Sequence, residues 1–160
     1  MRKLFLAGFL ILSLAASDAA VIRLAPELGF PGPGNQTKSL KSLRGQAVVL
    51  LITKSPENGA FKKQLKYLQE IYEQFAGKQV VFIAALGEGA GPIKSNIPFV
   101  VANNGPAVAS AFGVQDDFNL VIIGKDGNVD YQTSKVCPPE RVRDVIQNSF
   151  VVQENSRKGQ

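Results

Sequence analysis

The 160-residue chain has no histidine, no tryptophan and a single cysteine, Cys137. Without histidine it cannot form a Ser-His-Asp or Cys-His nucleophile pair, an imidazole general base or a histidine-ligated metal site. One thiolate with carboxylates is not a tetrahedral zinc set, so no metal is expected. A lone thiol also excludes an intramolecular disulfide, so a disulfide through Cys137 would have to join two molecules, as in a disulfide-linked dimer.

The first residues have the pattern of an export signal. Arg2 and Lys3 precede an apolar run from Leu4 to Ala16, and small residues follow up to Ala19. The run is shorter than the roughly 20 apolar residues that a membrane-spanning helix needs. Residues 1–19 are therefore predicted to be a signal peptide, with no stable membrane span after cleavage and a periplasmic or secreted location.

The net charge of +5 is spread over several short groups of basic residues. These groups are not interleaved with aromatic residues, so the chain has no stacking platform for single-stranded nucleic acid, and no nucleic-acid partner is expected. Scattered charge of this kind is typical of a solvated surface. A weaker alternative is an anion-binding surface formed by Lys62, Lys63 and Lys66.

The remaining sequence predicts one α/β domain. Residues 20–46 are rich in proline and glycine and are expected to be an extended lead-in; residues 47–152 should form the domain, and 153–160 a flexible tail. The apolar run Ala47–Ile52 is typical of a strand buried on both faces, and residues 79–86 form a second such strand. Between them, apolar residues at three- and four-residue steps from 61 to 75 predict a helix, which makes the two strands parallel.

The second half of the domain is predicted to be antiparallel. A short helix is expected over 106–112, and the pair Asp126-Gly127 between two strand-like runs predicts a hairpin. Pro138 should open a last helix. The glycine-rich stretch 87–92 lacks both the third glycine of a dinucleotide fingerprint and the Gly-Lys-Ser/Thr of a phosphate loop, so it is interpreted as a flexible linker and no cofactor is expected.

Three segments resemble a known family. Residues 39–50 resemble the Leu-x-x-Leu-x-Gly-Lys-x-Val-Val-Leu entry of redoxin domains, and residues 97–101 with 108–114 resemble their middle segment. Residues 122–129 are similar to their hairpin. In this order the chain resembles the thioredoxin-like or redoxin superfamily, which includes the alkyl hydroperoxide reductase/thiol-specific antioxidant group. The resemblance implies a thioredoxin-like fold, with a mixed central β-sheet flanked by helices.

The chain departs from that family at the redox site. Thioredoxin-like members carry Cys-x-x-Cys at the start of the first long helix, where the helix end lowers the pKa of the attacking thiol. Counting along the chain places Ser55-Pro56-Glu57-Asn58 on this motif and Phe118 on the family's cis-proline. Serine cannot exchange with a disulfide, so the resemblance implies a degenerate member. Ser55 is predicted to be the helix N-cap instead.

The sequence is compatible with two functions. The first is a non-catalytic binding or accessory module that contacts a protein or extended peptide around Ser55–Glu57, Phe118 and the Ile97-Pro98 segment, a surface suggested by the resemblance. The alternative is a one-cysteine thiol-redox protein related to thioredoxin and peroxiredoxin antioxidants, acting through Cys137, since a position at a helix start could lower its pKa. The adjacent acids Asp116-Asp117 are predicted to satisfy backbone donors in a turn rather than to bind a metal.

Overall fold

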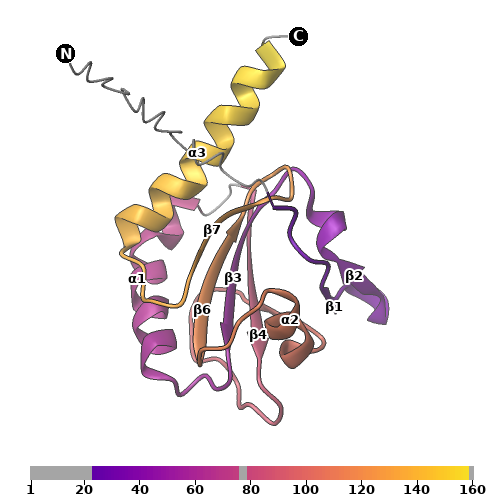
Figure 1. The fold of residues 1–160 in the computed structure, drawn as a ribbon, viewed down its shortest axis with the longest axis vertical. Coiled ribbons are helices and arrows are strands. Elements are labelled where there is room, and N and C mark those ends of the chain that lie inside the picture. Colours follow the sequence, from indigo (N-terminus) through magenta and orange to yellow (C-terminus); the bar gives the residue numbers. More distant parts are fainter. Residues whose placement is uncertain (1–22, 76–78, 159–160) are drawn as a thin grey trace, which may run out of the picture.

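The computed structural model describes residues 23–75 and 79–158 (Figure 1). A five-stranded sheet with strand order β5-β4-β3-β6-β7 forms its centre, and a two-stranded hairpin, β1-β2, lies beside it. In chain order the elements are β1 Gly29–Pro31, β2 Thr37–Ser39, β3 Ala47–Thr53, α1 Gly59–Phe75, β4 Val80–Leu86, β5 Val100–Val101, α2 Gly105–Ala111, β6 Phe118–Ile123, β7 Val129–Thr133 and α3 Pro139–Lys158. Short 3-10 turns occupy Pro33–Asn35 and Leu40–Leu43.

Strand β3 is the centre of the sheet, as its unbroken apolar run predicts. Every one of its residues is buried. It pairs in parallel with β4, with Ala47 opposite Val80, and antiparallel with β6, with Val48 opposite Ile123. The predicted parallel unit and the predicted antiparallel hairpin, β6-β7, are both confirmed. The sheet is therefore mixed.

The two faces of the sheet bury separate apolar clusters. Side chains alternate between the faces along each strand, so Val49 and Leu51 of β3 join one cluster while Val48 and Leu50 join the other. Helices α1 and α3 cover the first face, and α2 covers the second together with the hairpin (Figure 1). This is the predicted α/β architecture.

The N-terminal segment is more structured than its proline and glycine content suggests. The expectation of an extended lead-in over 20–46 is corrected, because part of this segment forms the β1-β2 hairpin and contributes core side chains. It buries four apolar side chains against the α2 face of the sheet: Ala25, Leu28, Phe30 and Leu40. Leu24 also forms a bridge with Asn128 beside β7, and the Ala25 N–H donates to the Gly127 carbonyl at 2.9 Å. The prolines and glycines supply the tight turns, while the apolar residues between them supply burial.

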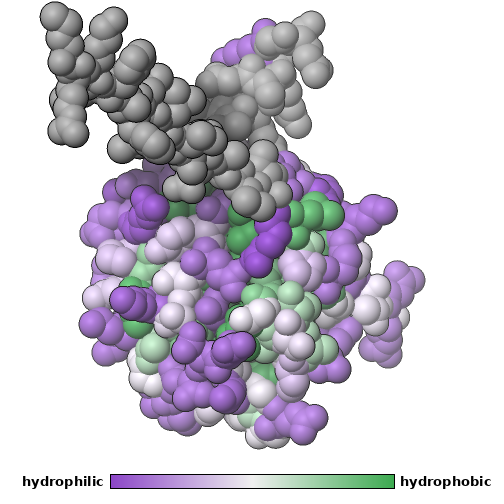
Figure 2. Space-filling view, viewed as in Figure 1, coloured by the Kyte–Doolittle hydropathy of each residue, from purple (hydrophilic) through white to green (hydrophobic). Residues whose placement is uncertain are grey.

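A signal peptide was expected at the start of the chain and a flexible tail at its end. Residues 1–19, predicted to be a signal peptide, lie outside the described residues. Helix α3 continues to Lys158, beyond Val152, where a flexible tail was expected to begin. None of the helices in the described part of the chain is long and apolar enough to cross a membrane. Figure 2 shows a face on which hydrophilic side chains surround small apolar areas.

Candidate binding site at the carboxyl end of β3

The tetrapeptide Ser55–Asn58 forms a turn between β3 and α1. The Asn58 N–H donates to the Ser55 carbonyl at 3.1 Å, and the Glu57 N–H donates to Ser55 Oγ at 3.1 Å. Helix α1 starts only at Gly59, and Asn58 Oδ1 accepts from the Phe61 N–H at 3.0 Å. The N-cap is therefore Asn58, and the prediction for Ser55 was wrong by one turn. Serine and asparagine are both good caps, and Pro56 here belongs to the turn rather than to the first helical position.

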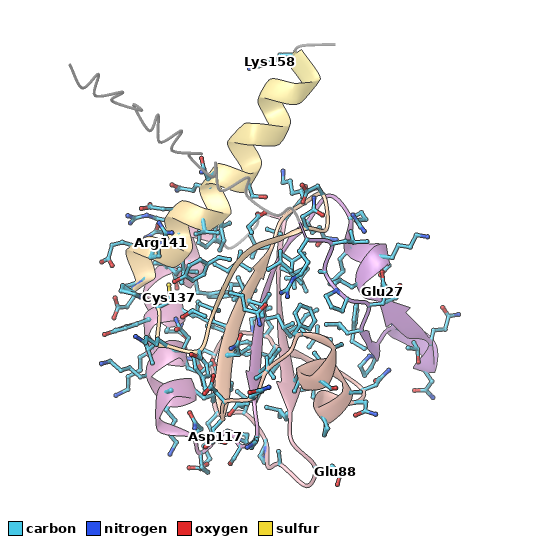
Figure 3. All side chains as sticks on the ribbon, in the orientation of Figure 1. Glu27, Glu88, Asp117, Cys137, Arg141 and Lys158 are labelled. Atoms are coloured by element: carbon cyan, nitrogen blue, oxygen red, sulfur yellow. The ribbon has the colours of Figure 1, made fainter. Side chains whose placement is uncertain are left out.

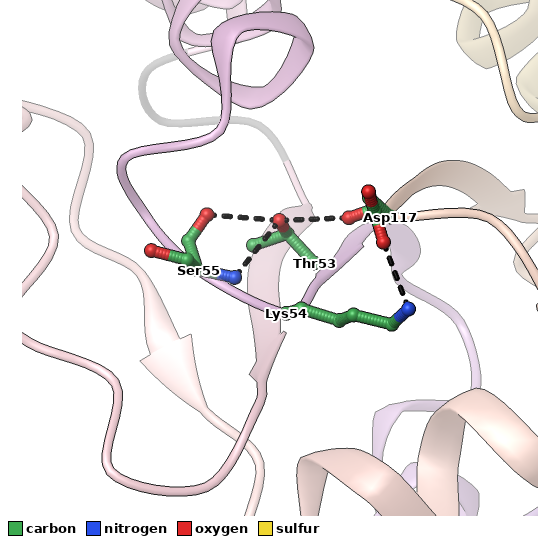
Figure 4. Close-up of polar contacts among 4 residues, drawn as sticks. All are labelled: Thr53, Lys54, Ser55 and Asp117. Atoms are coloured by element: carbon green, nitrogen blue, oxygen red, sulfur yellow. Dashed lines mark hydrogen bonds and ion pairs between the residues drawn. The ribbon is translucent and has the colours of Figure 1, made fainter.

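Thr53 ties this turn to the start of β6 (Figure 4). Its hydroxyl lies 2.9 Å from the Ser55 carbonyl and 3.0 Å from the Asp117 carbonyl, two acceptors for one hydrogen, and it also accepts from the Ser55 N–H at 3.3 Å. Thr53 is 3% exposed. No pattern in the sequence singles out this residue, since a threonine at the end of an apolar run looks like an ordinary strand residue. Its contacts make the end of β3 a fixed platform.

An exposed ion pair covers the platform. Lys54 Nζ lies 2.8 Å from Asp117 Oδ1, with side chains 72% and 67% exposed. The hydrogen bond from Lys54 to Asp117, together with the charge of that carboxylate, raises the pKa of Lys54.

The adjacent acids Asp116-Asp117 were predicted to satisfy backbone donors in a turn. The group that does so is the backbone carbonyl of Asp117 and not a carboxylate, since that carbonyl accepts from the Thr53 hydroxyl and the Lys54 N–H. No cluster of three or more candidate metal ligands occurs within residues 23–75 and 79–158.

The structure brings the predicted tetrapeptide and the start of β6 together, with Phe118 as the register partner of Thr53. Phe118 is nevertheless only 3% exposed and belongs to the apolar cluster under α1 and α3. It cannot contact a partner, and Asp117 is the exposed residue at this place. Ile97, also expected on the contact surface, is 3% exposed. No cis peptide bond occurs among the described residues, including at Phe118.

A second ion pair lies on the α1 side of the turn. Glu57 Oε2 is 2.6 Å from Lys62 Nζ, and the hydrogen bond from Lys62 and its charge lower the pKa of Glu57. The ammonium of Lys63 lies 5.7 Å from the centre of the Tyr67 ring. Two of the three lysines considered as an anion-binding surface are therefore engaged by groups of the protein.

Cys137 lies away from this end of the sheet, at the loop that leads into α3 beside α1 (Figure 3). It is 2% exposed. Burial raises the pKa of its thiol, against smaller opposite effects of a hydrogen bond with Tyr131 and the charge of Arg141. The expectation that the helix start lowers this pKa is therefore wrong, because desolvation of the thiolate outweighs it. A buried thiol is also badly placed to form a disulfide-linked dimer.

A cleft that the sequence did not reveal opens on the other side of the turn. It has a volume of about 630 Å³ and lies between the end of β3, the loop after β4 and α2. Two glycines bring its walls together: a Cβ on Gly87 would lie 2.4 Å from the Lys54 carbonyl oxygen, and one on Gly105 would lie 1.8 Å from that of Leu86. Gly87 was interpreted as the start of a flexible linker, and its real role is close backbone approach.

Comparison with solved structures places this fold in a known class. A protein assigned as the thiol:disulfide interchange protein DsbE from Chlorobium tepidum has a TM-score of 0.64 at 17% identity, over 80% of this chain and 96% of its own. A protein assigned as a thioredoxin from Neisseria meningitidis has a TM-score of 0.64 at 21% identity, over 79% and 89%. Peroxidoxin BcpB from Mycobacterium tuberculosis has a TM-score of 0.58 at 12% identity, over 82% and 96%.

These likenesses show the fold: the protein has a thioredoxin-like fold, as predicted, and its single cysteine excludes a Cys-x-x-Cys pair. Residues 39–153 match the model of a family described as Domain of unknown function (DUF4174). The chain belongs to this family. The sequence matches none of the curated proteins.

Proposed function

We propose that the protein is an exported, non-catalytic binding module that holds an extended segment of a partner protein at the carboxyl end of β3. One observation carries the proposal. The end of the sheet that would hold the redox site has serine and asparagine at the two expected thiol positions, and the only cysteine is buried elsewhere with a raised pKa. Thiolate chemistry needs an accessible, ionised sulfur.

The exposed residues at this end are the ones available for such a contact. Lys54, Glu57 and Asp117 are exposed there, and Ser55 is partly exposed. The tetrapeptide is rigid, because its turn is closed by backbone bonds and by Thr53. A rigid, polar and exposed edge reduces the ordering cost of holding a peptide.

Disulfide reduction tests the non-catalytic part. With dithiothreitol as reductant, we expect the wild-type protein and Cys137→Ser to reduce insulin disulfides no faster than dithiothreitol alone. A Cys137-dependent rate above this background would contradict the proposal and establish the one-cysteine redox alternative.

A gain of function tests whether the turn occupies the position of a redox motif. Ser55→Cys with Asn58→Cys, in a Cys137→Ser background, creates Cys-Pro-Glu-Cys across a turn in which residues 55 and 58 are joined by a backbone hydrogen bond. We expect this variant to form an internal disulfide and to gain insulin reduction. The same two cysteines placed at exposed positions of α1, Glu70→Cys and Gln74→Cys, are the matched control and should not gain it.

Export is tested separately. We expect the full chain, expressed in a bacterium with an outer membrane, to be recovered from the periplasm or medium with its first 19 residues removed. Recovery of the unprocessed chain from the cytoplasm would contradict this part alone.

A further inference from the structure

The cleft beside the Ser55–Asn58 turn has an apolar floor and a polar rim. Ile52, Pro106, Ala109 and Val114 contribute the apolar part of its lining. The charged residues of its lining are Lys54, Glu88 and Asp116. Its volume of about 630 Å³ is in the range of ligand sites, and an apolar floor with few polar groups is their usual composition. Lys54 is shared with the proposed contact surface, so the cleft is continuous with it.

The rim is locally negative although the chain carries a net charge of +5. Lys54, its one cation, is paired with Asp117 at 2.8 Å. Glu88 and Asp116 are exposed and belong to none of the ion pairs found in the described part of the chain. Figure 3 shows Glu88 and Asp117 at the same end of the sheet. Two carboxylates at the mouth of an apolar cleft favour a ligand that has positive charge next to an apolar group.

We propose that the cleft binds an extended peptide in which an aliphatic side chain is flanked by lysine or arginine. The aliphatic side chain lies on the floor between β3 and α2, and the flanking cations meet Glu88 and Asp116. The inference rests on the proposed function and adds the sequence preference of the partner segment.

Peptide titrations followed by amide NMR test this preference. The probes are three blocked pentapeptides: Ala-Lys-Leu-Lys-Ala, Ala-Glu-Leu-Glu-Ala and Ala-Lys-Gly-Lys-Ala. We expect the first to shift the amide signals of Gly87, Gly105 and Ser110, with weaker binding as salt rises from about 50 to about 200 mM. The acidic peptide should bind at least about tenfold more weakly, and the glycine-centred peptide should lose the contribution of the leucine side chain.

Paired variants separate the rim charges from net charge. Glu88→Gln with Asp116→Asn should weaken the Ala-Lys-Leu-Lys-Ala peptide by about three- to tenfold, because each exposed carboxylate contributes modestly. Glu70→Gln with Glu73→Gln removes the same charge from the exposed side of α1 and should leave the affinity within about twofold. Thermal unfolding of both double variants controls for folding.

The outcomes distinguish this inference from the proposed function. If basic and acidic peptides bind at this end of the sheet with equal affinity, or if the Glu88/Asp116 variant binds as tightly as wild type, the preference is overturned while peptide binding stands. Lys66 and Lys94 line a separate pocket beside α1. If the basic peptide shifts their amide signals instead of those of Gly87 and Gly105, the cleft assignment is overturned. If no peptide shifts any signal at the end of β3, peptide binding there is overturned as well.

Discussion

Both hydrogen-bonding groups of the Gln64 side-chain amide engage the backbone of Cys137. Gln64 Nε2 donates to the Cys137 carbonyl at 3.0 Å, and the Cys137 N–H donates to Gln64 Oε1 at 2.7 Å. Gln64 has no exposed surface, and Cys137 is 2% exposed. The pair joins α1 to the loop that precedes α3, so a buried polar side chain on α1 fixes the position of the closing helix.

Gln64→Ala should therefore destabilise the fold strongly. It leaves a buried N–H and a buried carbonyl without partners and opens a cavity, so we expect a loss of about 2–4 kcal/mol in the free energy of unfolding. Urea denaturation measures this loss. Gln74→Ala, at an exposed position on the same helix, is the control and should change stability by less than about 0.5 kcal/mol. Equal effects of the two substitutions would show that the Gln64 bonds are not formed.

Because Cys137 is buried, the free energy of unfolding should depend on pH in the alkaline range. The folded-state pKa of the thiol is raised, so the unfolded chain loses this proton first, from about pH 8.5 upward, and then binds fewer protons than the folded chain. The stability contributed by the protonated thiol is complete below that pH and falls as pH rises toward the folded-state pKa. We expect Cys137→Ser to remove this component, measured as urea midpoints between about pH 7.5 and 9.5.

Alkylation of Cys137 gives an independent measure of its accessibility. Iodoacetamide should react far more slowly with the folded protein than with the protein in urea at the same pH, because the buried thiol has neither access nor thiolate character. Equal rates in the two states would contradict the burial of this side chain.

Capping of α1 should depend on Asn58 and much less on Ser55. Asn58→Ala removes the acceptor of the Phe61 N–H and should cost about 1 kcal/mol, whereas Asn58→Asp keeps an acceptor and should restore most of it. Ser55→Ala removes only the bond within the turn. Thermal unfolding of the three variants measures these losses of stability. A larger loss for Ser55→Ala than for Asn58→Ala would show that Ser55, and not Asn58, is the N-cap of α1.

At the end of β3 the buried hydroxyl should matter more than the exposed ion pair. Thr53→Val keeps the shape but removes the group that bonds the Ser55 and Asp117 carbonyls, and we expect a loss of about 1–3 kcal/mol. Asp117→Asn breaks an ion pair that is mostly exposed, so its cost should be below about 1 kcal/mol and should shrink in salt. Denaturation at two salt concentrations compares them, and a costlier Asp117→Asn would contradict this order.

Sheet and helix order could be predicted because burial and periodicity are local in the sequence. The apolar run at Ala47–Ile52 and the turn pair Asp126-Gly127 specify their elements without reference to the rest of the chain. The Ser55–Asn58 turn was placed by counting from the first predicted helix against the pattern of the resembled family, and the structure has this turn between β3 and α1.

The remaining features depend on contacts between distant segments. Gln64 occupies the apolar side of α1, and only the backbone of Cys137, 73 residues away, explains a glutamine there. The roles of Gly87 and Gly105 depend on carbonyl groups of Lys54 and Leu86 that approach them in space. The N-cap was misplaced because Ser55 and Asn58 are equally suitable residue types, and the turn geometry selects between them.

The segment before β1 also affects how molecules of this protein meet one another. An exposed edge strand can pair with a strand of another molecule and start aggregation. At one edge of the sheet, Arg23 accepts a backbone bond from Val129 at 2.8 Å and Leu24 bridges to Asn128, so the chain covers the beginning of β7 with its own backbone. The opposite edge, β5, is two residues long. The N-terminal segment thus helps keep the protein from associating edge to edge, a protection that would be lost if the chain were cut just before Ser39, where the family match begins.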